Sequence, residues 1–277
     1  MTRGTISSHQ EIQLSEDSED GPLYIFESCS FNSLSNSGNG GAITCSASFS
    51  DSYKPQLTIK QSTFKSCSSS SGYGGAAYIN GPSSFIVEKT VFTDCNATYG
   101  YAGGLYFTSN RCLLLLSDSL FNSCHARMTC DSSKSIDDGG GFFISSSLPS
   151  TELHYIIQGC RFISCGCYDW GGGGCFGISS SVVGCANSLF SACKCGTAEA
   201  MGINLGTTDA DFLIHFCYFS CNEDATYHTD VSINRYSGSF SSPFLHSFSI
   251  KPITKSVTTI LNWTTSSYRN WFQKSRN

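Results

Sequence analysis

Residues 64–79 read FKSCSSSSGYGGAAYI, and variants of this stretch recur along most of the chain. Its F-x-x-C beginning and its glycine pair are two landmarks that lie about ten residues apart. The first landmark recurs at separations of 33, 28, 29, 41, 28 and 29 residues, at Phe31, Phe64, Phe92, Phe121, Phe162, Phe190 and Phe219. The glycine landmark follows with the same period, as GGAIT at 40–44 and GGLYF at 103–107. Two landmarks with one period predict a repeat protein.

Each repeat also contains an apolar run before the next phenylalanine, such as LTIKQSTF at 57–64 and FIVEKTVF at 85–92. Three short β-rich runs per repeat, separated by Gly, Ser and Asn turns, are typical of one coil of a β-solenoid. Leucine-rich repeats would show a Leu/Asn pattern, and propeller blades would need about 40 residues each. The sequence therefore predicts an all-β fold, a parallel β-helix (pectin-lyase-like solenoid) of about seven coils.

Stacking of the coils would turn equivalent residues into ladders, because neighbouring coils lie about 4.8 Å apart. The recurring phenylalanines then form an aromatic stack. The cysteines of the first landmark form a thiol column of Cys67, Cys95, Cys124, Cys165 and Cys193. Leu34 and Asn222 replace cysteine at its two ends. The glycine pair indicates a sharp corner, or a close approach to the next coil.

The loss of the repeat at both ends divides the chain into three segments. Residues 1–23 form an N-terminal lead-in or cap with a capping strand near Ile12–Leu14, and residues 24–236 form the β-helix. Residues 237–277 form a C-terminal cap or linker that is partly disordered. The net charge of -5 gives no drive toward nucleic acid. The longest apolar run, Leu113–Leu116, is far shorter than the about 20 residues of a membrane span, and the N-terminal sequence lacks the apolar segment of a signal peptide.

The pairing of F-x-x-(N/C) with GGA(I/L/Y) resembles the repeats of the polymorphic outer-membrane protein family. Residues 31–43, 64–79, 92–107 and 162–178 carry the resemblance best, and it covers roughly residues 26–233. The family usually has Asn where this chain has Cys, and such Cys-substituted repeats are similar to large repeat proteins of parasitic protists. The resemblance implies a right-handed β-helix in a surface protein with a non-enzymatic, adhesive function. We therefore expect this cysteine-rich chain at the cell surface or secreted as part of a longer chain, and otherwise inside the cell.

Aromatic residues between the two landmarks are the candidate binding residues. Stacked coils would place them on one side, where they could bind a protein or glycan ligand of a cell or matrix surface. Alternatively, some of them fold over the glycine corner. The candidates are Tyr73, Tyr99, Tyr101, Tyr168 and Trp170.

An enzymatic alternative rests on acidic residues, because parallel β-helices also include carbohydrate-cleaving enzymes. Asp138 and Glu199 share a register with His228, and Asp169 lies nearby in the repeat between them. Two of these carboxyl groups could act as general acid and general base on a polysaccharide, in a lyase or glycoside hydrolase. The competing interpretation is that they are ordinary polar residues of exposed loops.

The CGC and CKC sequences form the only metal candidate. Cys165, Cys167, Cys193 and Cys195 lie 28 residues apart as two pairs, and stacking would bring four sulfurs together, as a zinc site requires. A flat ladder is a poor tetrahedron, so we expect small, buried, apolar side chains there and no cofactor. Local disulfides are the other alternative, and they would require an oxidising compartment.

Overall fold

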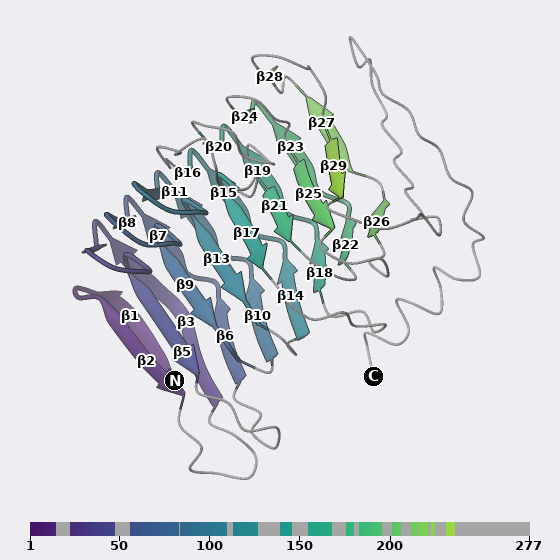
Figure 1. Cartoon of the computed structure of the whole chain (residues 1–277). Coiled ribbons are helices and arrows are strands. Elements are labelled where there is room, and N and C mark those ends of the chain that lie inside the picture. The colour runs from purple at the N-terminus through teal and green to yellow at the C-terminus, as the bar shows by residue number, and fades with distance from the viewer. Residues whose placement is uncertain are drawn as a thin grey trace.

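A computed structural model describes residues 1–14, 23–47, 56–82, 84–109, 113–126, 139–145, 155–167, 176–179, 183–195, 201–205, 212–215, 217–220, 223–224 and 231–235. Within these ranges the chain is a parallel β-solenoid without a helix, wound from the N-terminal strands at one end of the stack (Figure 1). The predicted all-β fold with parallel, stacked coils is confirmed.

Three parallel sheets run along the solenoid. The first has 14 strands: β1 (Thr2–Ile6), β3 (Leu23–Asn32), β6 (Gln56–Lys60), β7 (Thr63–Lys65), β10 (Ser84–Glu88), β11 (Val91–Thr93), β14 (Leu113–Ser117), β15 (Leu120–Asn122), β18 (Tyr155–Gln158), β19 (Arg161–Ile163), β22 (Val183–Ala186), β23 (Leu189–Ser191), β26 (Phe212–His215) and β27 (Tyr218–Ser220). The second has seven: β4 (Ser35–Asn36), β8 (Ser68–Ser69), β12 (Asn96–Ala97), β16 (His125–Ala126), β20 (Gly166–Cys167), β24 (Lys194–Cys195) and β28 (Glu223–Asp224). The third has eight: β2 (Gln10–Leu14), β5 (Ile43–Ala47), β9 (Ala77–Asn80), β13 (Leu105–Thr108), β17 (Phe142–Ser145), β21 (Phe176–Ser179), β25 (Met201–Leu205) and β29 (Val231–Arg235).

The number of coils differs from the prediction of about seven. About four turns, between residues 23 and 145, are described with most of their strands and side chains. From β18 onward the described parts are mainly the strands, which extend all three sheets. The right-handed sense of the winding stays a prediction.

The recurring phenylalanines form the predicted stack in the interior. Rings of neighbouring coils lie 4.5 to 5.0 Å apart between centroids and within 8° of parallel, from Phe31 through Phe190. These six side chains are completely buried. Each landmark phenylalanine therefore contributes apolar burial and a ring contact to both neighbours, which fixes the register of the coils.

The predicted thiol column lies beside this stack. Its five cysteines are at most 1 % exposed, and Leu34 is buried at its N-terminal end. Each sulfur has two backbone carbonyls within hydrogen-bond distance of its S–H group, one in its own coil and one in the preceding coil. Cys95 Sγ, for example, lies 3.4 Å from Thr93 O and 3.7 Å from Phe64 O. The column is thus a set of small buried side chains with their hydrogen bonds satisfied. Asn222, expected at its other end, lies outside the described residues.

Two corners per coil use left-handed backbone, in most coils at residues other than glycine. The first lies directly before the thiol column, at Ser33, Ser66, Asp94, Ser123, Ser164 and Ala192, with φ between 51° and 55°. The second interrupts the run that the sequence predicted as one strand, for example at Gln61 between β6 and β7. Each full coil therefore contains four strands, such as β6 to β9, and not the three that we expected.

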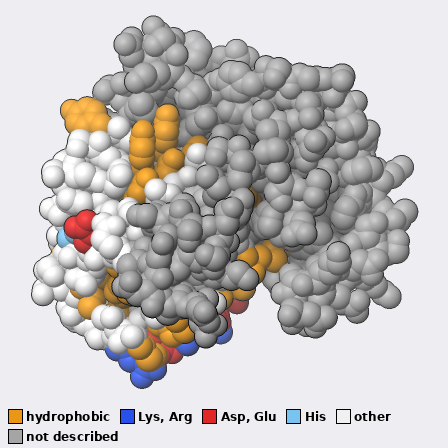
Figure 2. All heavy atoms as spheres, turned by 60° about the horizontal axis from the view of Figure 1, so that its bottom comes forward, with side chains coloured by type: hydrophobic (Ala, Val, Ile, Leu, Met, Phe, Trp, Pro, Cys, Tyr) orange, Lys and Arg blue, Asp and Glu red, His pale blue; other side chains and the backbone are white. Residues whose placement is uncertain are grey.

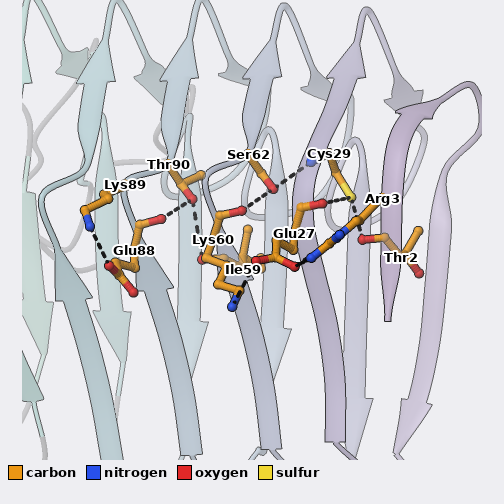
Figure 3. Close-up of polar contacts among 10 residues, drawn as sticks. All are labelled: Thr2, Arg3, Glu27, Cys29, Ile59, Lys60, Ser62, Glu88, Lys89 and Thr90. Atoms are coloured by element: carbon orange, nitrogen blue, oxygen red, sulfur yellow. Dashed lines mark hydrogen bonds and ion pairs between the residues drawn. The ribbon is translucent and has the colours of Figure 1, made fainter.

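A small polar residue follows the second corner in each coil and links neighbouring coils. Ser62 Oγ donates to Lys60 O at 2.8 Å and accepts the Cys29 N–H at 3.1 Å (Figure 3). Ser119 repeats this arrangement with Ser117 O and the Thr90 N–H. We call this set the corner column. Its members are Cys29, Ser62, Thr90, Ser119, Cys160, Ser188 and Cys217. Its hydrogen bonds satisfy backbone N–H groups that the sharp corner removes from the sheet.

The glycine landmark combines both features that its sequence suggested. Its first position has left-handed backbone, with φ of 62° at Gly40, 68° at Gly74 and 58° at Ala102. Its second position lies against the next coil, where a Cβ added to Gly75 would lie 2.2 Å from Gly103 O. Because Leu105 pairs with Ala77, Ala102 and not Gly103 takes the first position in the third repeat.

The N-terminal segment covers the first coil. β2 includes the predicted capping strand near Ile12–Leu14 and pairs with β5, whereas β1, which we did not predict, pairs with β3. Arg3 and Lys60 both form ion pairs with Glu27, and Lys60 Nζ lies 3.1 Å from Glu27 Oε1 (Figure 3). Their hydrogen bonds lower the pKa of the Glu27 carboxyl. Charged side chains thus join β1 to the first two coils at the surface.

Candidate functional site

An aromatic column occupies the outer face of the third sheet. In β9 the side chains alternate, so that Ala77 and Ile79 are buried in the solenoid and Tyr78 lies on the outside. The parallel register places Tyr106 of β13 next to Tyr78, and Phe143 of β17 next to Tyr106. The ring centroids of these neighbours lie 5.3 and 5.5 Å apart. Three consecutive coils therefore build one external stack of rings.

Two loop tyrosines pack on this column. The rings of Tyr73 and Tyr101 stack on each other at 5.0 Å, with 4° between their planes. Tyr73 also lies 5.0 Å from Tyr106, and Tyr101 lies 5.4 Å from Phe143. We call the five residues Tyr73, Tyr78, Tyr101, Tyr106 and Phe143 the tyrosine cluster. It is a double row of rings separate from the interior core, and it packs around Ala102.

The five side chains of the cluster differ in their exposure to solvent. Phe143 is 2 % and Tyr106 is 8 % exposed, whereas Tyr73, Tyr78 and Tyr101 are half-buried. Burial raises the pKa of both Tyr78 and Tyr106 above the ordinary phenol value. Their hydroxyl groups therefore stay protonated and able to donate at neutral pH. The cluster is thus partly accessible through Tyr73, Tyr78 and Tyr101, on the outer face of a sheet.

The predicted binding residues divide into three groups. Tyr73 and Tyr101 belong to the cluster and cover the corner at Ala102, as the alternative interpretation proposed. Tyr99 is 57 % exposed and has no ring contact among the described residues. Tyr168 and Trp170 lie outside the described residues.

Sequence reasoning missed Tyr78, Tyr106 and Phe143, which form the base of the cluster. The pattern that could have found them is the alternation after the glycine landmark, in AAYIN, LYFT and FFIS. The middle aromatic residue of each run is on the outer face, and its neighbours on both sides are inward. The sequence analysis did not separate the two faces of these runs.

The structure describes none of the acidic candidates and the side chains of only two of the four metal candidates. Asp138, Asp169, Glu199 and His228 lie outside the described residues. Cys165 and Cys193 are buried in the thiol column, and the sulfur of each donates to backbone carbonyls at 3.5 to 3.6 Å. Cys167 and Cys195 pair as neighbours in the second sheet. Within the described ranges, no three His, Cys, Asp or Glu side chains are placed to hold a metal ion.

The described surface around these elements carries little charge. In Figure 2 it is mostly neutral, with hydrophobic side chains gathered in stripes and most of the visible charged side chains at its lower edge. Among the described segments, no helix is long and apolar enough to cross a membrane. The composition agrees, because only 13 % of all residues are charged. Contacts with a partner would therefore depend on aromatic and neutral polar groups.

Comparison of the chain with protein-family models, curated proteins and solved structures gives no match.

Proposed function

We propose that this chain is a non-enzymatic surface or adhesion-type repeat protein that presents an extended solenoid face for binding. The observation that carries the proposal is the tyrosine cluster, in which five rings from three coils meet on an outer sheet face. Tyrosine is enriched at binding surfaces because its ring buries a large area and its hydroxyl donates hydrogen bonds. The ligand would be a protein or glycan of a cell or matrix surface.

The cluster is more than the fold requires. The same outer column holds Glu11 and Thr44 in the two strands before Tyr78, and Gly177 and Gly202 in the two after Phe143. A solenoid face can therefore be completed with small or polar residues at these positions. Aromatic side chains confined to three coils form a local patch, which is the usual composition of an interaction site.

Family membership and location belong to the same proposal. The two landmarks and the parallel solenoid fit the repeats of the polymorphic outer-membrane protein family, and so do the short turns between strands. On this basis the chain acts at the cell surface, or is secreted as part of a longer chain. The alternative of a carbohydrate-active enzyme rests only on Asp138, Asp169 and Glu199.

A binding comparison tests the proposal. The purified chain is applied to immobilised matrix proteins and to a glycan array, beside the variant Tyr73→Ser/Tyr78→Thr/Tyr101→Ser. Threonine is chosen because Thr44 is the neighbour of Tyr78 in the same column. We expect at least a tenfold weaker binding, since loss of interface anchors costs about 1.4 kcal/mol or more.

Two controls make the result specific. The variant Lys65→Ser/Thr93→Ser changes paired residues of the first sheet and should bind as the parent chain does. Circular dichroism and the Tm should show that both variants stay folded. Equal binding by the cluster variant would contradict the proposal, and cleavage of a polysaccharide that Asp138→Asn abolishes would favour the enzyme.

A further inference from the structure

Two buried cysteines from consecutive coils lie in contact near the C-terminal end of the solenoid. Cys185 is in β22, and Cys217 directly precedes β27. Their sulfur atoms are 3.7 Å apart, and the two residues are 2 % and 1 % exposed. Neither cysteine is disulfide-bonded in the structure.

The fold itself brings these two positions together. Cys217 belongs to the corner column, whose longer members reach the backbone of an inward residue in the preceding coil. Thr90 Oγ1 lies 3.4 Å from Ile59 O, and Cys160 Sγ lies 3.5 Å from Leu116 O. Cys217 Sγ lies likewise 3.5 Å from Cys185 O. The register places Ile59, Leu116 and Cys185 in one column of inward-facing residues. Because the residue of this column that Cys217 contacts is itself a cysteine, the contact brings two sulfur atoms together.

We propose that Cys185 and Cys217 are a disulfide-forming pair that covalently joins these two coils when the chain folds under oxidising conditions. The oxidant is a disulfide, such as oxidised glutathione. One thiolate attacks a sulfur of this disulfide and releases one thiol; the second cysteine then attacks the mixed disulfide and releases the other. The pair loses two electrons and two protons, which leave with the oxidant as two thiols.

Burial determines when this bond forms. The neighbouring thiol and the surrounding apolar groups raise the pKa of Cys185, so little thiolate exists once the coils have closed. The exchange therefore takes place while the last coils assemble, and the finished disulfide is then shielded from reductants.

The thiol column is a poorer place for a cross-link. Its cysteines occupy equivalent positions, and a thiol there interacts with the thiols of both neighbouring coils, as Cys95 does with Cys67 and Cys124, so that no unique pair is selected. Cys185 and Cys217 instead come from different columns, and their sulfur atoms lie 3.7 Å apart.

The position of the pair in the fold indicates that a disulfide would stabilise the last described coils. β22 and β23 pair with β26 and β27, the last strands of the first sheet among the described residues. Terminal repeats have a neighbour on one side only and therefore open first. A disulfide there joins the last described coil of the first sheet to the coil before it.

Oxidative refolding of the full chain tests this inference. The denatured, reduced protein is refolded in a series of glutathione buffers, alkylated, digested without reduction and mapped by mass spectrometry. We expect a Cys185–Cys217 cross-link as the principal disulfide, and a Tm roughly 5 to 15 °C higher than that of the reduced chain. Cys185→Ser and Cys217→Ser should each abolish that increase.

The control is Cys160→Ser, a change in the same corner column, which should keep both the cross-link and the increase in Tm. The inference is overturned if both thiols are still alkylated at the most oxidising ratio. Disulfides that join either cysteine mainly to another residue would overturn it as well.

Discussion

The glycine landmark gives the sharpest prediction, because its two positions need glycine for different reasons. Gly74 has left-handed backbone, and an added Cβ would lie 2.1 Å from Ala77 O in its own coil, although the equivalent position of the next coil is occupied by Ala102. Gly75 faces the next coil, where an added Cβ would lie 2.2 Å from Gly103 O and 2.4 Å from Asn96 C. We therefore predict that Gly75→Ala destabilises the protein much more than Gly74→Ala.

The expected magnitudes follow from these contacts. An alanine in left-handed backbone costs about 1–2 kcal/mol, and Ala102 shows that the fold accepts one at the position equivalent to Gly74. At Gly75 the two coils must separate by about 1 Å, although the hydrogen bonds from Gly75 N to Ala102 O and from Ala76 N to Gly104 O hold them together. Overpacking and the loss of these bonds together cost about 3 kcal/mol or more.

Equilibrium urea denaturation of the parent chain and three variants measures the difference. Ala102→Gly should raise the free energy of unfolding by up to about 1 kcal/mol, because it relieves the same backbone strain that Gly74→Ala introduces. Gly74→Ala and Gly75→Ala should differ by at least about 1.5 kcal/mol. Losses equal within about 0.5 kcal/mol would refute the assignment of the second glycine to close coil packing.

Three further predictions concern the core, the buried thiols and the N-terminal cap. Phe92→Ala should lower the free energy of unfolding by about 3–5 kcal/mol in urea denaturation, since it removes a completely buried ring that stacks on Phe64 and Phe121; a loss below about 1 kcal/mol would show that the stack is absent. Stability should fall as the pH rises from about 9 toward 11, because burial raises the pKa of Cys45 and Cys160 to about 12 from 9.0 in the unfolded chain, so that unfolding releases protons in this window. In Tm measurements across this range, Cys160→Ser should make the fall smaller, and an unchanged slope would count against the buried thiol. Deletion of residues 1–14 should expose the edges of β3 and β5 and cause concentration-dependent association in light scattering, and a monodisperse product would argue against the capping role.

The repeat made the fold predictable because stacked coils place equivalent residues in contact. Phe31, Phe64 and Phe92 recur at nearly constant spacing, and the structure stacks their rings. The same reasoning correctly placed Cys67 and Cys95 in the interior. A period is a property of sequence alone, so it could be read without knowledge of the backbone.

What the sequence did not reveal depends on backbone geometry at single residues. The second corner lies at residues such as Gln61 and Lys89, types that do not usually indicate left-handed backbone, so the sequence predicts one strand from 57 to 64. The outer ring column was missed because Tyr106 and Phe143 lie within runs that are apolar on both faces. Periodicity cannot separate the two faces of such a run.

The most direct test of the central claim is a nuclear Overhauser experiment on protein with selectively labelled tyrosine rings. Tyr73 and Tyr101, and likewise Tyr78 and Tyr106, are 28 residues apart in sequence, yet their ring centroids are 5.0 and 5.3 Å apart. The account predicts strong ring-to-ring cross-peaks within both pairs, each lost in the matching Tyr→Phe variant grown with unlabelled phenylalanine. Absence of these cross-peaks within the two pairs in folded protein would contradict both the stacking register and the binding surface that depends on it.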